Sequence, residues 1–424
     1  MEFTQKIFHS QFNASCEFTS PDLFLKIERK PNIGNVVTVN GYVGVIALNS
    51  GTQIEILPKI DLSNNEDYSK NRRILVAMLQ ALKAFNNQFF KQASLNVSRM
   101  NIFEIFISMY LNGLSLLTRR GLKSGYITEE DNLKYFRGRL LVSENLKRNL
   151  THQERFYMAH DEYHVNCAEN RLIKSTLLKL KSISGSSSNI QELIRQLAFF
   201  ENVEESYNLD KDFNQCASDD RNHPEYTSVI EWSKVFLKNK GFSSFTGSTS
   251  ATALLFEINK LFEEYVACSL KTIFENYDSN IRLVEQDKAL SLFNIPRKIF
   301  KLKPDIVIKK RKSGAPVLVM DTKWKTVIPD IMANFGLSQA DMYQMYAYGK
   351  KYKVKEVWLI YPATSYSDEL KDLYFESQED NLTVRIKFFD LSVAIEKEKT
   401  ETVKKDFIGE YKNLKEFVGQ VGMA

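Results

Sequence analysis

The sequence predicts an α+β chain made of three parts and a short tail. Three patterns predict it: β-branched residues broken by turns near the start, helical periodicity through the middle, and helices alternating with strands near the end. With 424 residues the chain is too long for one ordinary core. We place the parts at residues 1–62, 63–250 and 251–395, with a helical tail at 396–424.

The first part is a predicted small β unit. Residues 35–60 are rich in valine, isoleucine and threonine and are interrupted by Asn-Gly and Asn-Ser-Gly turns. This pattern is typical of a meander of short strands. Apolar residues at helical spacing then begin at Ile74 and again at Ile102, so the chain is expected to become helical near residue 65.

The second part, residues 63–250, is expected to be mainly helical, with an amphipathic helix from Arg171 to Leu180. A run rich in serine, threonine and glycine at residues 243–250 marks the entry to the third part. There the pattern predicts a helix over residues 251–275, strands over 281–324, a helix over 337–351 and a strand over 356–361. A mixed sheet flanked by helices is therefore expected.

The composition limits the class of protein. It is 43% hydrophobic and 26% charged, the apolar runs are too short for a membrane span, and no secretory signal is recognised at the start. We therefore expect a soluble, cytoplasmic protein without a membrane partner. The four cysteines form no CxxC pair, and the helical spacing of His160 and His164 lacks further nearby ligands, so a structural reading of that pair is favoured.

The third part holds the pattern with the clearest chemistry. Lys303-Pro-Asp305 precedes one apolar strand, and Asp321-Thr-Lys323 ends the next, with a glycine-containing turn between them. In such a hairpin Asp321 and Lys323 share a face, and Asp305 begins the partner strand. Two carboxylates there suit Mg²⁺, with Mn²⁺ as a substitute, and the lysine suits an attacking water. A solvated hairpin is the alternative, and the residues described next argue against it.

Two helices supply further candidates. Glu263 borders the buried side of its predicted helix, whereas Glu264 shares a solvated face with Lys260, so Glu263 is the preferred third acid. Gln344 and Tyr348 lie one helical turn apart and suit a bracing role at the metal site. We assign the neighbouring Tyr343 and Tyr346 to an aromatic core stripe.

Together these motifs resemble the RecB-like branch of the PD-(D/E)xK nucleases. The wider chain resembles the McrC family, the nuclease subunits of McrBC-type, modification-dependent restriction systems. The likeness runs from Tyr42-Val-Gly-Val-Ile and Ile54-Glu-Ile-Leu-Pro-Lys59 through Phe136-Arg-Gly-Arg-Leu140 and Glu169-Asn-Arg-Leu-Ile-Lys174 to Leu261-Phe-Glu-Glu-Tyr265 and the nuclease motifs. It implies a PD-(D/E)xK endonuclease domain that cleaves double-stranded, modified DNA.

The resemblance also implies a partner, an McrB-like AAA+ GTPase hexamer that binds the N-terminal part of the chain and whose GTP hydrolysis the chain stimulates. The sequence has no G-x-x-x-x-G-K-[ST] phosphate loop, so no nucleotide is expected to bind this chain itself. Two alternatives stay open: a stand-alone or repair-type nuclease of the same core, and a non-catalytic activator of a partner NTPase. Intact acids and lysine argue against the second.

Basic residues in the middle part suit DNA phosphates, a partner surface or solvated helix charges equally well. They are Arg119, Arg120, Lys123, Lys134, Arg137, Arg139, Lys147 and Arg148.

Overall fold

The computed structural model describes most of the chain and divides it into two compact units. The described residues are 25–30, 34–39, 41–48, 53–60, 68–81, 101–218, 224–238, 251–379, 381–394 and 396–421. One unit comprises Met1–Phe85, Asn96–Ile102 and Phe245–Ala424, and the other Asn86–Leu95 and Phe103–Ser244. The N-terminal strands therefore belong to the same unit as the predicted nuclease part. The serine-rich run at residues 243–250 lies outside the described residues.

The centre of the first unit is a six-stranded mixed sheet in the order β15-β16-β14-β13-β12-β9. The strands β13, β14 and β16 run parallel, and the other pairs are antiparallel. Their bounds are β9 Ile281–Glu285, β12 Ile306–Lys310, β13 Pro316–Thr322, β14 Glu356–Pro362, β15 Tyr374–Ser377 and β16 Leu382–Phe389.

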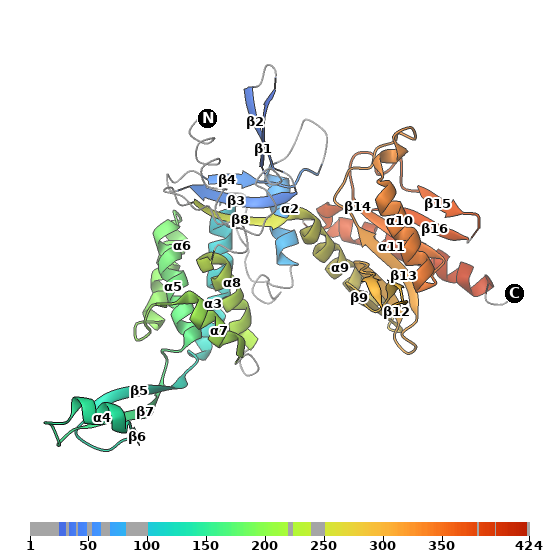
Figure 1. Ribbon diagram of the computed structural model, residues 1–424. Coiled ribbons are helices and arrows are strands. Elements are labelled where there is room, and N and C mark those ends of the chain that lie inside the picture. The colour runs from blue at the N-terminus through green and yellow to red at the C-terminus, as the bar shows by residue number, and fades with distance from the viewer. Residues whose placement is uncertain are drawn as a thin grey trace. The chain divides into compact units, whose positions relative to one another are not determined.

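Helices cover both faces of this sheet (Figure 1). On one face, α10 (Gln339–Tyr352) packs Met345 and Tyr348 into a core with Val357 and Leu359 of β14. On the other face lie α9 (Ile258–Tyr277) and α11 (Lys397–Val421), whose aromatic rings surround Trp358. The α+β class and the mixed sheet flanked by helices are confirmed.

The predicted helix over residues 251–275 is wrong in its first seven residues. Ala251–Glu257 form a strand, β8, and the helix α9 begins only at Ile258. β8 pairs along its whole length with β3 (Tyr42–Leu48), which also pairs with β4 (Gln53–Ile56). A short apolar run has no decisive period, so pairing with a segment about 200 residues away decided its conformation.

The remaining elements of the first unit are short. β1 (Leu25–Lys30) and β2 (Gly34–Val39) form a hairpin, and the helix α2 (Tyr68–Gln80) follows β4. A separate two-stranded hairpin consists of β10 (Ser291–Phe293) and β11 (Ile299–Lys301). The described part of the unit also has the 3-10 turns η2 (Asn334–Gly336) and η3 (Leu391–Ala394).

The second unit contains a helical bundle, as predicted for the middle of the chain. Tyr110 on α3 donates or accepts a 3.0 Å hydrogen bond with Ser233 on α8, and Phe106 packs against Trp232. The helices are α3 Ile102–Arg120, α5 Ala168–Ile183, α6 Ser187–Phe199, α7 Leu209–Ser218 and α8 Pro224–Lys238.

The middle of the chain also contains a sheet that the sequence reading missed. It has the order β5-β7-β6, with β5 Gly125–Leu133, β6 Arg139–Leu140 and β7 Phe156–His164, and carries the helix α4 (Val142–Arg148) (Figure 1). Acidic residues interrupt the apolar alternation of these strands, which hid them. His160 and His164 therefore lie on β7 rather than on a helix. No described helix has the length and apolar composition needed to cross a bilayer.

Candidate active site

Two of the predicted acids meet where the inner strands β12 and β13 of the six-stranded sheet begin and end, respectively. Asp305 directly precedes β12, and Asp321 is the penultimate residue of β13, to which β12 is antiparallel. Thr322 joins the two motifs, because its backbone N–H and its hydroxyl each donate a 2.7 Å hydrogen bond to Oδ2 of Asp305. The hairpin geometry thus places both carboxyl groups at the same end of adjacent strands.

Lys323 and the two α10 residues form a chain of contacts beside these acids. The Lys323 Nζ lies 2.5 Å from Oδ2 of Asp321 and 3.3 Å from Oε1 of Gln344. Gln344 in turn donates from Nε2 to the hydroxyl of Tyr348 at 2.7 Å. Asp321, Lys323, Gln344 and Tyr348 are therefore brought together, with the lysine held between an acid and an amide.

Glu263 reaches the same site from α9. Its Oε1 accepts a 2.7 Å hydrogen bond from Nε2 of Gln286, and the backbone N–H of Gln286 donates to the carbonyl of Asp305 at 2.8 Å. The neighbouring Glu264 is also half-buried rather than fully solvated. Glu263 is nevertheless linked to Asp305 through these two hydrogen bonds of Gln286.

Burial and neighbouring acids raise the pKa of carboxyl groups at this site. Burial, followed by the charges of Asp321 and Glu263, raises the pKa of Asp305 to about 8. Burial also raises the pKa of Asp321, which the Lys323 ammonium partly offsets, and the pKa of Glu263. Converging carboxylates with raised pKa values favour a divalent cation, and oxygen donors are those that Mg²⁺ and Mn²⁺ prefer.

Lys323 has the opposite balance. Burial alone would lower the pKa of its ammonium group. The carboxylates of Asp321 and Asp305 raise this pKa by more than burial lowers it, so the net pKa is raised. The group is thus a cation at neutral pH. It can donate hydrogen bonds to a phosphate oxygen or a water molecule, but it cannot accept a proton from that water.

Burial at the site differs from what a solvated hairpin and an aromatic core stripe would give. The side chain of Asp321 is only 1% exposed, so an alanine there would leave a cavity in the protein interior. Tyr343 and Tyr346 were expected in a core stripe, yet both are exposed. The buried side of α10 is instead formed by Met345, Tyr348, Gly349 and Tyr352. Tyr348 therefore also serves the core, and burial raises the pKa of its hydroxyl.

Sequence reasoning missed two residues of the site, Thr322 and Gln286. Thr322 lies between the two motif residues, and its position at the strand end was a usable signal, because a side chain there can turn back to the adjacent strand. Gln286 follows β9 with a positive φ of 46°, which carries its amide toward Glu263. Nothing in the sequence around Gln286 marks it, since its role depends on the approach of α9.

The first expected result separates the two glutamates. Glu263→Gln should reduce DNA cleavage about 100-fold, because it removes one oxygen charge from the three-acid cluster while it keeps the side-chain volume. Glu264→Gln, one position along the same helix, is the matched control and should stay within about threefold of the native rate. Single-turnover cleavage rates measure both, and equal small effects would remove Glu263 from the site.

The second expected result concerns pH and metal binding. The unfolded chain loses the Asp305 proton near its ordinary pKa of 3.8, whereas the folded chain keeps it until about pH 8. The metal-free protein is therefore stabilised by this group below about pH 4 and loses that stability as pH rises toward 8, by at most about 1.4 kcal/mol per pH unit for one proton.

Mg²⁺ should consequently raise the melting temperature more at pH 8 than at pH 5.5, since it replaces the missing protons. Asp305→Asn should flatten the metal-free pH profile and remove most of the Mg²⁺ effect. Thermal denaturation of both proteins with and without Mg²⁺ measures this. An unchanged profile in the variant would contradict the coupling of Asp305 to the other acids.

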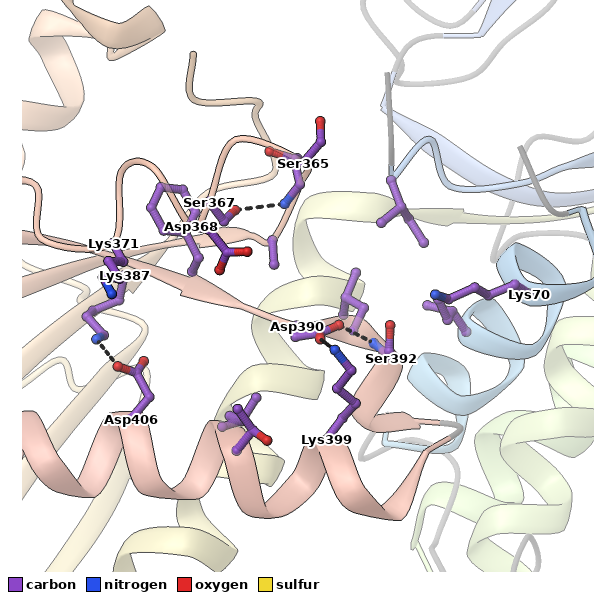
Figure 2. Close-up of a pocket in the computed structure, with 18 of the residues that line it drawn as sticks. Lys70, Ser365, Ser367, Asp368, Lys371, Lys387, Asp390, Ser392, Lys399 and Asp406 are labelled. Carbon is purple, nitrogen blue, oxygen red and sulfur yellow. Dashed lines mark hydrogen bonds and ion pairs between the residues drawn. The ribbon is translucent and has the colours of Figure 1, made fainter. Parts of the chain in front are cut away.

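A separate cavity of about 760 Å³ opens along the same edge of the sheet (Figure 2). The strand register aligns Thr322 with Ile360 and Ile360 with Lys387, which places Lys387 two strands, or roughly 10 Å, from the strand that bears Asp321. Figure 2 shows Lys387 pointing to Asp406 and Lys399 to Asp390, at 2.8 and 3.5 Å. These pairs attach α11 to the strand β16 and the residues that follow it.

A further group of possible metal ligands lies on the β5-β7 sheet. Glu129, His160 and Glu162 approach one another there, and this is a strand-to-strand arrangement rather than the helical pair considered from the sequence. Arg137 already forms a 2.6 Å ion pair with Glu162. The pairing of β5 with β7 and this ion pair account for the closeness of the three side chains.

Of the eight basic residues singled out from the sequence of the middle region, four form ion pairs that the described part of the chain shows. Lys123 contacts Glu169 at 2.6 Å, and Arg148 lies over the ring of Tyr157 as well as beside Glu144. A role in DNA or partner contacts stays a prediction for the set. The residues in described ion pairs are Lys123, Arg137, Lys147 and Arg148.

Comparisons with known proteins agree with this architecture. A chain from a tetradecameric assembly of Thermococcus gammatolerans McrB AAA+ hexamers with bound McrC has 18% identity and a TM-score of 0.64, over 97% of this chain and 92% of that one. A chain of the Thermococcus gammatolerans McrBC complex has 19% identity and a TM-score of 0.45, over 64% and 79%. None of the curated proteins searched matches this sequence.

The first of these likenesses shows a shared fold. The family described as McrBC 5-methylcytosine restriction system component matches residues 37–362, which include Glu263, Asp305, Asp321, Lys323, Gln344 and Tyr348. This match covers well over half of the sequence and agrees with the resemblance of its motifs. The chain belongs to the McrBC 5-methylcytosine restriction system component family.

Proposed function

We propose that the chain is the endonuclease subunit of an McrBC-like, NTP-dependent restriction complex and hydrolyses phosphodiesters of double-stranded, modified DNA. The observation that carries the proposal is the convergence of Asp305, Asp321 and Glu263 beside a protonated Lys323, in a member of a restriction-system family. Acids alone occur at many sheet edges. Three converging acids with a lysine beside Asp321 are the kinds of group that metal-assisted hydrolysis uses, since the acids can hold the metal and the cation can bind the phosphate or the water.

Each residue has a distinct proposed role. Asp305 and Asp321 would hold Mg²⁺, and Glu263 would hold it directly or through water, with Mn²⁺ as a substitute. A bound Mg²⁺ supplies neutralisation of the phosphate charge and a lowered pKa of the attacking water. Thr322 fixes the orientation of the Asp305 carboxylate, since it donates to one oxygen and leaves the other available.

Lys323 would bind the phosphate or orient the water as a cation. Asp321 and Gln344 hold its Nζ, and Tyr348 holds Gln344, so the lysine stays directed at the acids rather than into solvent. Pre-positioned donors of this kind contribute more at a buried site than in water, because they need no reorganisation during the reaction. Gln344 and Tyr348 are in this view positioning residues.

We further propose a hexameric AAA+ GTPase as the partner. The structural neighbour comes from an assembly of McrB AAA+ hexamers with bound McrC, and this sequence has no phosphate loop of its own. Two surfaces are candidates for the contact: the N-terminal β unit and the β5-β7 sheet. The latter carries exposed apolar side chains, namely Tyr135, Phe136, Leu146, Leu150 and Tyr163.

Deletion of residues 1–62 is a poor test of the first surface. It would remove β3, the central strand of the order β4-β3-β8, and expose the buried Leu254 and Leu255 of β8. Loss of partner binding would then follow from misfolding. Substitutions of exposed residues are cleaner, and Ile54→Ser and Leu150→Ser each change one candidate surface.

The test is co-purification with the AAA+ partner followed by cleavage of methylated and unmethylated duplexes with GTP or ATP. We expect little cleavage by the chain alone, NTP-dependent double-strand cuts with the partner, and stimulated NTP hydrolysis. Either Ile54→Ser or Leu150→Ser should lower that stimulation severalfold.

Efficient cutting without the partner would favour a stand-alone or repair-type nuclease. Stimulation of the NTPase without any metal-dependent cleavage would favour a non-catalytic activator. Either result contradicts the proposed function.

A further inference from the structure

The β10-β11 hairpin leads directly into the candidate active site. β11 ends at Lys301, four residues before Asp305, and the hairpin forms a two-stranded sheet of its own rather than extending the six-stranded one. Its base is fixed: the N–H of Leu302 donates to the carbonyl of Leu290 at 2.9 Å, and both side chains pack into the core under α10. The hairpin is thus a rigid attachment next to the acids.

The tip of this hairpin exposes large apolar side chains. Ile295 is 88% exposed, Phe300 68% and Phe293 54%. The two phenylalanine rings meet edge to face at 6.1 Å, and the backbone of Phe300 has a positive φ of 52°, a conformation that bulky residues rarely adopt. Grouped apolar side chains on a projecting element mark a binding surface more often than a structural requirement.

The charge of the segment restricts what can bind there. Residues 288–303 contain Lys288, Arg297, Lys298, Lys301 and Lys303 and no aspartate or glutamate, whereas the whole chain has 57 basic and 52 acidic residues. All five are exposed, and within the described part of the chain none of them forms an ion pair. Protein interfaces are depleted of lysine, so five unpaired cations along an apolar hairpin and at its base favour a polyanion.

We propose that the β10-β11 hairpin enters the minor groove of the DNA beside the scissile phosphate, with Ile295 as an apolar wedge against the base pairs. Apolar side chains such as isoleucine and phenylalanine unstack base steps when they are inserted from this groove, and flanking cations hold the two phosphate backbones. This inference rests on the proposed nuclease function. It adds a DNA-positioning element that the motifs of the active site do not contain.

The test uses the full-length protein with its AAA+ partner, in Ca²⁺ to prevent cleavage, and a duplex that carries 2-aminopurine at successive steps. The native protein should raise 2-aminopurine fluorescence at one step near the cut. Ile295→Ser should remove most of that rise, while the exposed Ile194→Ser on α6 should not. Both isoleucines are exposed, so neither change opens a core cavity.

The cations are tested through the salt dependence of DNA binding. Arg297→Gln with Lys298→Gln should weaken binding about tenfold and lower the slope of log K against log salt by about 2, one for each lost phosphate contact. Lys312→Gln is the matched control, because Lys312 is exposed in the β12-β13 turn, at the end of these strands away from Asp305.

The outcomes separate this inference from the proposed function. If the native complex cuts DNA but the hairpin variants bind and cut like it, the inference is wrong and the nuclease assignment stands. If the variants instead lose NTPase stimulation with native DNA binding, the hairpin meets the protein partner, which also overturns it. A complex that never cuts DNA with Mg²⁺ rejects the proposed function, and absence of DNA binding rejects both.

Discussion

Asp321→Asn is expected to lower DNA cleavage at least about 1,000-fold while the protein stays folded, a loss of about 4 kcal/mol of transition-state stabilisation. The amide has the volume of the carboxylate but supplies no charge to a metal. Asparagine is preferred to alanine because the Asp321 side chain is almost completely buried. Asp305→Asn should have an effect of similar size, since Asp305 is the second proposed carboxylate ligand of the metal.

Single-turnover cleavage with the AAA+ partner measures this loss, and circular dichroism together with partner NTPase stimulation shows that the variants remain folded. Asp368→Asn is the control, because Asp368 is an exposed acid in the loop after β14. Cleavage by Asp321→Asn within tenfold of the native rate would reject this edge of the sheet as the active site.

Lys323→Met is expected to lower the cleavage rate about 100- to 1,000-fold with little change in DNA affinity. The methionine keeps most of the side-chain length but removes the cation that Asp321 and Gln344 hold in place. Donors directed at charge that develops in the transition state typically contribute about 3 to 4 kcal/mol. The effect should therefore appear in the rate constant rather than in binding.

Lys325→Met is the matched control two residues away. Lys325 forms a 2.7 Å ion pair with Asp341 on the surface and makes no described contact with the three acids, so its loss should change the rate less than threefold. Because the carboxylates of Asp321 and Asp305 raise the pKa of Lys323, the native pH–rate profile should show no lysine titration around neutral pH. A basic limb near pH 8 that disappears in Lys323→Met would mean that Lys323 accepts a proton instead.

The sequence by itself determined the local part of the site. Asp305, Asp321 and Lys323 belong to one hairpin, in which the strand period and a short turn bring them together. Helical periodicity predicted Glu263, Gln344 and Tyr348 as further candidates, because residues three or four positions apart share a face. The α+β class and the helical bundle followed from such local patterns as well, whereas the restriction family was indicated by the resemblance of the motifs to a known family.

Only the tertiary structure decided which groups surround that hairpin. Gln286 is a polar residue of ordinary type, and its contact with Glu263 exists because α9 approaches it. The strand β8 forms because β3 offers it a partner from the far end of the sequence. The strands β5 and β7 were not predicted, because acidic residues interrupt the apolar alternation of their sequences.

The burial of Asp321 was likewise beyond local reasoning. The strand period places Asp321 on one face of the sheet. Only when α10 covers that face is the carboxylate removed from solvent, and this burial raises its pKa. The physical reason is the same in each case. Periodicity and turn chemistry act over a few residues, whereas burial, pairing partners and electrostatic coupling depend on segments that are distant in sequence and adjacent only after folding.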